Sequence, residues 1–464
     1  MTNNFLQSFS QIIMRLKVNK IHSLSVLIFI IVFLFSLWSH PSFIPKTSPD
    51  SWGYINLAKD FNHKISEIRP FFFPLLIKFC MSLSEMYWQQ ILLIIQISFH
   101  ALICILLFHL YVRLKIEKII SFLLTLIIGF NPSLVYYTTY LLADHLLAVL
   151  TFLAWFFTII FIQKYNKNEK INIHLILIGI FSGLAIVTKP QSILGIIPFI
   201  LAFIFVSNKS TKLIKPIIIL LIINFSFHQL WEQYKSYNST GTSFELLDFI
   251  EFPINMTAIR GGLVDYGKGT DLYNLLEERE LLETARNLKI SLSYTMDEDP
   301  DYLQLYKSLK DDWDIKNDKE FAKKILNHAP LELFIYSISN WHAFFTKRCF
   351  GPGEGSFPNM PKIIRYFYIV SYSLFYRPLL AILLLVSFAI FWNKRLLALL
   401  FSSGGILLYA SLSIAILSIH GGEFPRYRVW IEYIMLFCAL FPIGILLEYF
   451  SKSLYSLFRG IINK

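Results

Sequence analysis

Two acidic residues stand at the ends of long apolar segments, where a carboxylate could take a proton from a substrate. Asp50 follows the first apolar segment, next to Pro49, and Asp144 opens the fourth segment. A carboxylate that loses solvation holds a proton more readily, which suits it to the role of general base. The dipole at the start of a helix also explains an acid there, so both interpretations stay open for each residue.

Basic residues in comparable positions could supply the opposite charge. They are Arg69, Lys189, Arg426 and Arg428. A guanidinium can bind a phosphate group through two hydrogen bonds, whereas a long basic side chain at a membrane edge can also extend toward lipid headgroups in general. Either interpretation fits any single residue. Their common placement, on the side where bases are normally depleted, favours a phosphate site.

Aromatic and polar side chains in the same segments are candidates for binding a sugar. They are Trp52, Tyr54, Tyr137, His145, His420 and Glu423. The loop around Asp50 is crowded with aromatic rings, and such an amphipathic setting suits a sugar. We therefore predict a substrate site that brings these residues together with the acids and the bases.

No motif supports a metal or another cofactor. The four cysteines show no paired spacing, and the histidines inside apolar segments fit no metal pattern. Patterns for dinucleotides, nucleoside triphosphates and zinc proteases are also absent. We predict no metal ligand and no cofactor; a divalent ion is compatible with the acids, but nothing in the sequence supports it.

The elements that must position these residues are membrane helices. Hydrophobic residues make up 55% of the 464 residues, charged residues make up 16%, and the mean hydropathy is +0.55. A stretch of about 20 apolar residues can cross the bilayer as a helix. We predict an all-α polytopic membrane protein with about ten transmembrane helices. The predicted spans begin or end near Trp38, Trp88, Ile119, Asp144, Lys189, Lys209, Trp231, Asn393, His420 and Lys452.

Basic clusters fix the predicted orientation. They recur at alternate ends of the spans, which places the N-terminus in the cytoplasm and every candidate site residue outside. The net charge of +11 therefore reflects membrane topology, and we predict no nucleic-acid partner. The expected location is the cytoplasmic (inner) membrane of a bacterium, as a multi-pass protein with its active site facing the periplasm or the outside.

The predicted domains are a membrane domain over residues 1–237, an extracytoplasmic and mostly helical insertion over 238–350, and C-terminal spans over 351–464. Asp271–Leu288 is predicted to be one amphipathic helix. Asn317–Glu320 is predicted to be a capping box that opens a helix to His328. Leu331–Phe350 is predicted to be a helix that lies against the membrane.

The order of short motifs resembles one family. The first outer loop holds Asp50, Tyr54, Ala58, Arg69-Pro70 and Pro74; the next outer turn holds Asn131-Pro132 and Asp144; Gly183-Leu184-Ala185 leads into Thr188-Lys189-Pro190. This order is similar to that of C-type (GT-C fold) membrane glycosyltransferases, the group with aminoarabinose transferases and protein O-mannosyltransferases. Unlike many relatives, the first loop has a single acid, which puts a bound divalent metal in doubt, and the insertion resembles no known acceptor-binding domain.

The resemblance implies an inverting sugar transfer from a polyprenyl-phosphate donor. Asp50 would take the proton of the acceptor hydroxyl or amine. Lys189, with one or more of Arg69, Arg426 and Arg428, would stabilise the departing lipid phosphate, and Asp144 would help to position the reactants, together with His145. Because residues two apart on a helix point in different directions, we expect only one of Arg426 and Arg428 to act in this way, and we favour Arg426, which follows Pro425. The acceptor would be a glycan, a glycolipid or a protein, with lipopolysaccharide or a related cell-envelope glycan as the natural expectation.

Two other functions fit a membrane protein with outer-side charges. A polysaccharide polymerase or ligase also uses lipid-linked glycans, and the first-loop pattern around Asp50 favours the glycosyltransferase over it. A lipid or solute transporter is the non-enzymatic alternative. Transporters commonly show internal repeats, broken helices and polar groups at mid-membrane, whereas the charges here gather at one edge.

Overall fold

The computed structural model describes residues 21–40, 43–61, 70–165, 172–206, 214–238, 248–288, 300–309, 318–339, 341, 357, 359–374, 379–393, 396–417 and 423–462. These residues form helices and no strand, apart from one isolated bridge between Lys46 and Tyr140. The predicted all-α class of a polytopic membrane protein is therefore confirmed.

The membrane part consists of the first helix and the elements on either side of the insertion. After the first helix (Ile21–Trp38) these are α2 (Pro49–Lys59), α3 (Phe72–Leu83), α4 (Trp88–Arg113), α5 (Lys118–Gly129), α6 (Pro132–Thr138), α7 (Ala143–Tyr165), α8 (Asn172–Ile186), the short 3-10 helix η1 (Pro190–Ile196), α9 (Ile197–Val206), α10 (Ile214–Asn238), α19 (Lys362–Leu374), α20 (Leu380–Phe391), α21 (Leu397–Leu417) and α22 (Glu423–Ile462).

Six of the described helices are long and apolar enough to cross a membrane. A bent pair, α5 with α6, adds a seventh candidate if the two helices form one span. These seven coincide with predicted spans. The predicted fifth, sixth and eighth spans coincide with shorter apolar helices of 10–17 residues. A further short apolar helix, α3, lies where the sequence predicted only a loop. The total of ten spans stays a prediction.

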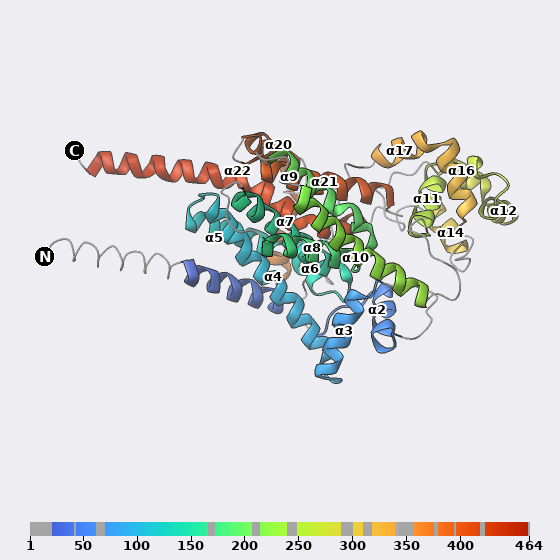
Figure 1. Ribbon diagram of the computed structural model, residues 1–464, viewed down its shortest axis with the longest axis horizontal. Coiled ribbons are helices and arrows are strands. Elements are labelled where there is room, and N and C mark those ends of the chain that lie inside the picture. The colour runs from blue at the N-terminus through green and yellow to red at the C-terminus, as the bar shows by residue number, and fades with distance from the viewer. Residues whose placement is uncertain are drawn as a thin grey trace.

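Two helices, α7 and α22, form the centre of the bundle. In each of them 83% of the apolar window is buried, against 22% in the first helix and in α10. α7 packs against α8 and α22, and α22 also packs against α20 and α21 (Figure 1). Side chains at the start of α7 are therefore held by packing on several sides.

The packing of α8 against α10 leaves no room for a side chain at Gly183. A Cβ atom added there would lie 2.1 Å from Cδ2 of Phe227. This close approach fixes the position of α8 at a point six residues before Lys189. It therefore also helps to fix where Lys189 lies, three residues after the end of α8.

The insertion has a hydrophobic core of its own. Its described elements are α11 (Asp248–Arg260), η3 (Val264–Gly267), α12 (Asp271–Glu278), α13 (Leu282–Asn287), α14 (Pro300–Ser308), α16 (Lys319–His328) and α17 (Pro330–Ser339). α11 and α17 pack against α21, which ties the insertion to the membrane bundle. The domain boundaries at 237/238 and 350/351 stay a prediction.

The structure corrects two details of the insertion. The single helix predicted over Asp271–Leu288 is wrong, because the chain turns at Glu280 with φ of 58° and separates α12 from α13. The helix that ends at His328 is confirmed, but its cap is Asp318, whose carboxylate accepts from the backbone N–H of Phe321. Of the predicted membrane-lying helix, the described part is α17 and Trp341; residue 340 and residues 342–350 lie outside the described residues.

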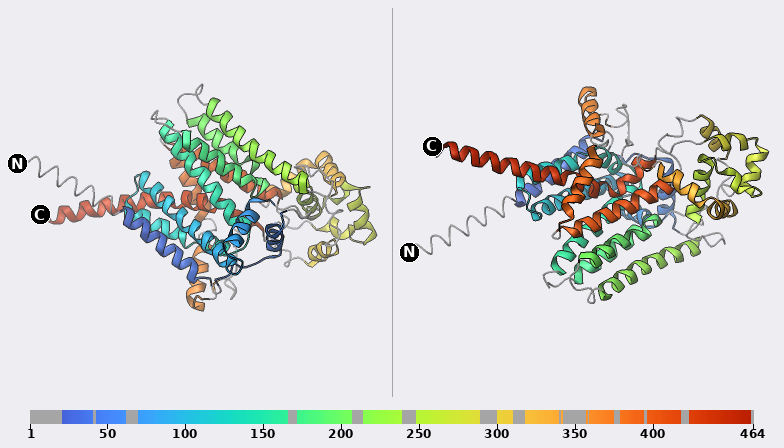
Figure 2. Two further views of the ribbon diagram at one scale, coloured as in Figure 1. Left: turned by 60° about the horizontal axis from the view of Figure 1, so that its bottom comes forward. Right: turned by 90° about the horizontal axis from the view of Figure 1, so that it is seen from above.

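The insertion lies at one end of the molecule. The first helix begins and α22 ends at the opposite end (Figure 1), and the two other views show the same arrangement (Figure 2). α22 therefore runs from the insertion end of the bundle toward the end where the first helix begins. Which end faces the cytoplasm stays a prediction from the basic clusters.

Candidate active site

Four of the predicted site residues are in contact with one another. Arg426 Nη2 lies 2.7 Å from Asp50 Oδ2, and Arg426 Nε lies 3.2 Å from Asp144 Oδ2. Lys189 Nζ lies 2.5 Å from the other oxygen of Asp144, Oδ1. We call Asp50, Asp144, Lys189 and Arg426 the charge cluster. Because it joins two acids to two bases, its formal charges balance.

Asp50 is placed by the first turn of α2. Pro49 occupies the first helical position, where its lack of an N–H costs no hydrogen bond. Ser51, the residue after Asp50, donates from Oγ to the carbonyl oxygen of Leu141 at 2.8 Å. The backbone of Lys46 also pairs with residues 139 and 141. These bonds fasten the start of α2 to the segment just before Asp144, which brings the two acids together.

Asp144 and Lys189 come from the facing ends of α7 and α8. Asp144 lies in the first turn of α7, where the helix dipole favours a negative charge. Lys189 follows α8 and precedes Pro190, which opens η1, and its backbone N–H donates to the carbonyl of Ala185 at 2.9 Å. Burial lowers the pKa of Lys189 below its ordinary value, although the Asp144 carboxylate opposes this effect.

The four side chains differ in exposure. Asp50 is 31% exposed and Arg426 is 22% exposed, whereas Lys189 is 9% and Asp144 only 3% exposed. A substrate that enters from outside the bundle therefore reaches Asp50 and Arg426 first. Asp144 and Lys189 form the buried half of the charge cluster.

Tyr427 contacts the charge cluster although the sequence did not single it out as a site residue. Its ring centroid lies 4.8 Å from Lys189 Nζ and 5.6 Å from Arg426 Cζ. Both distances suit a cation–π contact. The signal in the sequence was its place directly after Arg426, but a neighbouring position alone does not show which way a ring points.

Arg428 lies apart from the charge cluster. It is fully buried, and its Nε donates to Glu432 one turn along α22 at 3.0 Å. Residues two apart on a helix point in different directions, so Arg426 reaches the acids while Arg428 points elsewhere. The pairing with Glu432 was not predicted, although its spacing of four residues was visible.

The predicted sugar-binding residues have different surroundings. Trp52 is 58% exposed. Tyr54 is buried and packs edge-on against Phe73, and Tyr137 is buried beside other tyrosines. His145 is fully buried and bonds to Tyr433. Trp52 is therefore the most exposed of the four, while the other three are held by packing.

Three predicted site residues remain without a described side chain. Arg69 and His420 lie outside the described residues, and Glu423 opens α22 with its side chain outside the description. Their placement relative to the charge cluster therefore stays a prediction.

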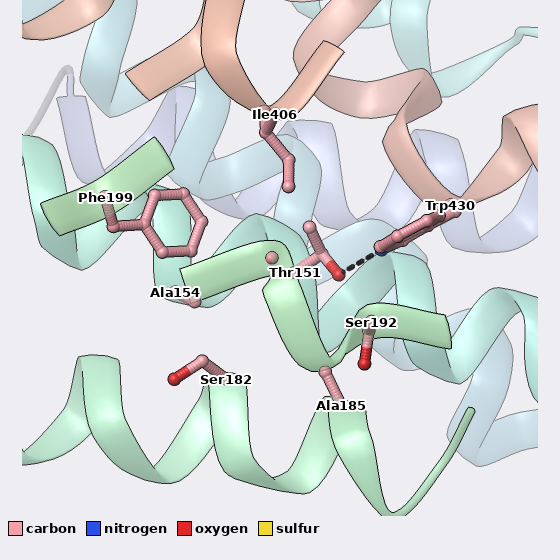
Figure 3. Close-up of a pocket in the computed structure, with 9 residues that line it drawn as sticks. Thr151, Ala154, Ser182, Ala185, Ser192, Phe199, Ile406 and Trp430 are labelled. Carbon is pink, nitrogen blue, oxygen red and sulfur yellow. Dashed lines mark hydrogen bonds between the residues drawn. The ribbon is translucent and has the colours of Figure 1, made fainter. Parts of the chain in front are cut away.

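A small pocket lies deeper in the bundle. Its cavity volume is only about 10 Å³, and it is partly open to the outside. Its lining includes Thr151, two turns after Asp144, and Trp430, one turn after Arg426. The indole N–H of Trp430 donates to Thr151 across this pocket at 2.6 Å (Figure 3). Among the described residues, none of the predicted site residues lines the pocket, so it is separate from the charge cluster.

A divalent metal does not fit the charge cluster as it stands. Arg426 contacts both carboxylates, and its positive charge opposes a cation between them. Over the described part of the chain, no three metal-ligating side chains of the His, Cys, Asp and Glu types gather at one point.

Comparison with known proteins relates part of the chain to a family. Residues 68–231 match the family model described as dolichyl-phosphate-mannose-protein mannosyltransferase. Asp144 and Lys189 lie inside this segment, and Asp50 and Arg426 lie outside it. The match confirms the resemblance to C-type membrane glycosyltransferases that the motifs indicated.

One solved structure also shows similarity. The crystal structure of ArnT from Cupriavidus metallidurans in the apo state matches with a TM-score of 0.32 and 11% identity, over 90% of this chain and 78% of that chain. No curated protein matches the chain. The relationship to the family rests on the match over residues 68–231.

Proposed function

We propose that this chain, a C-type membrane glycosyltransferase by its family match, moves a sugar from a polyprenyl-phosphate donor to an acceptor outside the cytoplasm. One observation carries the proposal: a single guanidinium, that of Arg426, contacts the carboxylates of both Asp50 and Asp144. Such an arrangement holds a general base and a phosphate-binding cation side by side, as the transfer requires.

Asp50 is the general base in this proposal. It is the more exposed of the two acids, so an acceptor hydroxyl or amine can reach it. The acceptor oxygen or nitrogen attacks the anomeric carbon and its proton passes to Asp50. The bond from the anomeric carbon to the phosphate oxygen breaks on the opposite face, which inverts the configuration, and its electron pair leaves with the polyprenyl phosphate.

Arg426 receives the leaving phosphate. A guanidinium suits a phosphate because it offers paired donors, and Arg426 is the more exposed cation. A bound phosphate competes with Asp50 for this guanidinium, so donor binding frees the carboxylate to accept a proton. Lys189 neutralises Asp144 from the buried side and adds positive charge behind the phosphate, and Asp144 orients Arg426.

The remaining predicted residues complete the proposed site. Trp52 offers an exposed face for a sugar ring. The acceptor is a glycan, glycolipid or protein, with a cell-envelope glycan such as lipopolysaccharide as the expected product. The site faces the periplasm or the outside of a bacterial cytoplasmic membrane.

The test uses the purified protein in nanodiscs with polyprenyl-phosphate sugars labelled in the sugar. The proposal expects that labelled sugar moves to a co-reconstituted envelope glycolipid and that free polyprenyl phosphate appears in equal amount. Products that grow into a ladder of repeat units would indicate the polymerase instead. Movement of the intact labelled lipid between leaflets, with no polyprenyl phosphate released, would contradict the proposal and favour a transporter.

A further inference from the structure

A second polar network lies inside the bundle, separate from the charge cluster. The hydroxyl of Tyr433 on α22 lies 2.7 Å from His100 Nδ1 on α4 and 3.1 Å from His145 Nε2 on α7. His100 Nε2 lies 2.9 Å from the carbonyl oxygen of Gly129, the last residue of α5. All three side chains are buried. The network therefore joins three helices at one hydroxyl group, and His100 extends it to a fourth, α5.

The chemistry of the groups fixes the direction of the hydrogen bonds. The carbonyl of Gly129 can only accept, so the neutral His100 carries its proton on Nε2 and accepts at Nδ1. The Tyr433 hydroxyl must then donate to His100, and its oxygen accepts from His145 Nε2–H. One arrangement of protons satisfies these three bonds, while His145 Nδ1 has no hydrogen-bond partner among the described residues. A network of this kind specifies one relative placement of its helices, because an unpaired polar group is costly in a dry interior.

This placement bears directly on the charge cluster. His145 is the residue after Asp144, and Tyr433 lies seven residues, about two helix turns, after Arg426. The same two helices, α7 and α22, therefore meet at the Asp144–Arg426 pair and again at the His145–Tyr433 pair. The bond from Trp430 to Thr151 joins them once more (Figure 3).

We propose that Tyr433, with His100 and His145, is a positioning residue that holds α7 and α22 where the Asp144 carboxylate orients Arg426. The expected effect of Tyr433 on turnover rests on the proposed function, whereas its expected effect on the contacts of the charge cluster does not. Small displacements of catalytic groups reduce rates strongly, on the order of 100-fold for about 1 Å. The hydroxyl of Tyr433 therefore matters to the reaction without touching a substrate.

The test compares two buried tyrosines, of which only Tyr433 bonds to the residue next to Asp144. Tyr433→Phe removes the shared hydroxyl. Tyr111→Phe is the matched control, because Tyr111 is equally buried on α4 and donates to the carbonyl of Phe437 on α22 at 3.2 Å. Both variants lose a buried hydrogen bond between α4 and α22, and Tyr433→Phe also loses the bond from His145 on α7. For Tyr433→Phe we expect kcat to fall about 10- to 100-fold with little change in KM for the donor, and for Tyr111→Phe we expect kcat to stay near that of the wild type.

A second measurement needs no activity. The shift in melting temperature caused by each tyrosine variant is measured in the natural background and with Asp144→Asn. Positioning predicts that the Tyr433→Phe shift shrinks by more than half with Asp144→Asn, because the contact it supports has already been altered. The Tyr111→Phe shift should be equal in both backgrounds.

The outcomes separate the two proposals. Equal Tyr433→Phe shifts in both backgrounds would overturn the positioning role whatever the activity. The expected coupling in a wild-type protein that transfers no sugar would support positioning and reject the proposed function. Coupling together with sugar transfer, but with kcat of Tyr433→Phe equal to that of Tyr111→Phe, would also overturn the positioning role in the reaction.

Discussion

Lys189 and Arg426 carry the same charge but have different surroundings in the charge cluster. Lys189 is held against Asp144 and Tyr427 with little exposure, whereas Arg426 extends to the exposed Asp50. An uncompensated charge in a buried position costs several kcal/mol, whereas an exposed charge is solvated. Replacing Lys189 therefore disturbs the buried half of the cluster first.

We expect Lys189→Gln to lose most of the turnover, roughly 2–4 kcal/mol by analogy with the loss of an oxyanion donor. It should also lower the melting temperature, because Asp144 loses its closest partner. Lys189→Arg keeps the charge and should retain a good part of the activity. Turnover of purified variants in nanodiscs, with melting temperature alongside, tests this. Wild-type turnover in Lys189→Gln would remove this residue from the proposed site.

The residue types of the site were visible in the sequence, but their contacts were not. Apolar segments with flanking bases placed Asp50, Asp144 and Lys189 at span ends, but they did not show that Lys189 pairs with Asp144 while Asp50 pairs with Arg426. The sequence favoured Arg426 over Arg428 for the site, but the partners of the two arginines could not be assigned, because they depend on which face of α22 meets α7. The contact of Tyr427 with Lys189 depends on the same rotation and was missed for the same reason.

At the scale of elements, the position of α8 depends on a close approach to α10, beside the hydrogen bond that Asn224 donates to Ser182. Gly183 faces the Phe227 ring of α10, and an added Cβ would lie 2.1 Å from it. In contrast, a Cβ added at Gly404 in α21 would come no closer than 3.9 Å to Phe388. The two glycines therefore differ in the space around them while both lie inside helices.

We expect Gly183→Ala to destabilise the protein by about 1–3 kcal/mol, the usual cost of overpacking. Gly404→Ala is the control, and it should be neutral or slightly stabilising, because alanine favours a helix over glycine. Thermal unfolding of both variants in the same detergent provides the measurement. Equal melting temperatures for the two variants would show that α8 and α10 adjust to the extra methyl group.

The elements that sequence patterns predicted well are the long apolar ones. Trp88–Arg113 and Ala143–Tyr165 match the predicted second and fourth spans, since a run of apolar residues this long has few alternatives to a membrane helix. The amphipathic stretch over 271–288 was predicted poorly because its break depends on a single left-handed residue, Glu280. A pattern of leucines continues across such a turn and hides it.

At the scale of the whole molecule, the insertion and the end of α22 lie at opposite ends (Figure 1). The positive-inside rule predicts that the basic clusters lie in the cytoplasm and the acidic insertion outside. The proposed use of a donor in the outer leaflet depends on this orientation. Sidedness can be measured in cells without any knowledge of the substrate.

We expect a cysteine introduced at Asp271, in the insertion, to react with a membrane-impermeant maleimide added to intact cells. A cysteine at Lys394 should react only after the cells are opened. Each cysteine is introduced singly into a variant that lacks the four native cysteines, and that variant without an added cysteine gives the background labelling. Reaction at position 394 in intact cells would reverse the orientation and place the charge cluster on the cytoplasmic side.

The central claim is that the charge cluster releases polyprenyl phosphate from a sugar donor as the sugar is transferred. The most direct measurement is the rate of polyprenyl phosphate release by purified wild type, Asp50→Asn and Arg426→Gln in nanodiscs containing donor and acceptor. We predict a reduction of about 100-fold or more in kcat for Asp50→Asn, the scale of a lost general base, and a similar loss for Arg426→Gln. Release at the wild-type rate by both variants, with melting temperatures unchanged, would contradict the account.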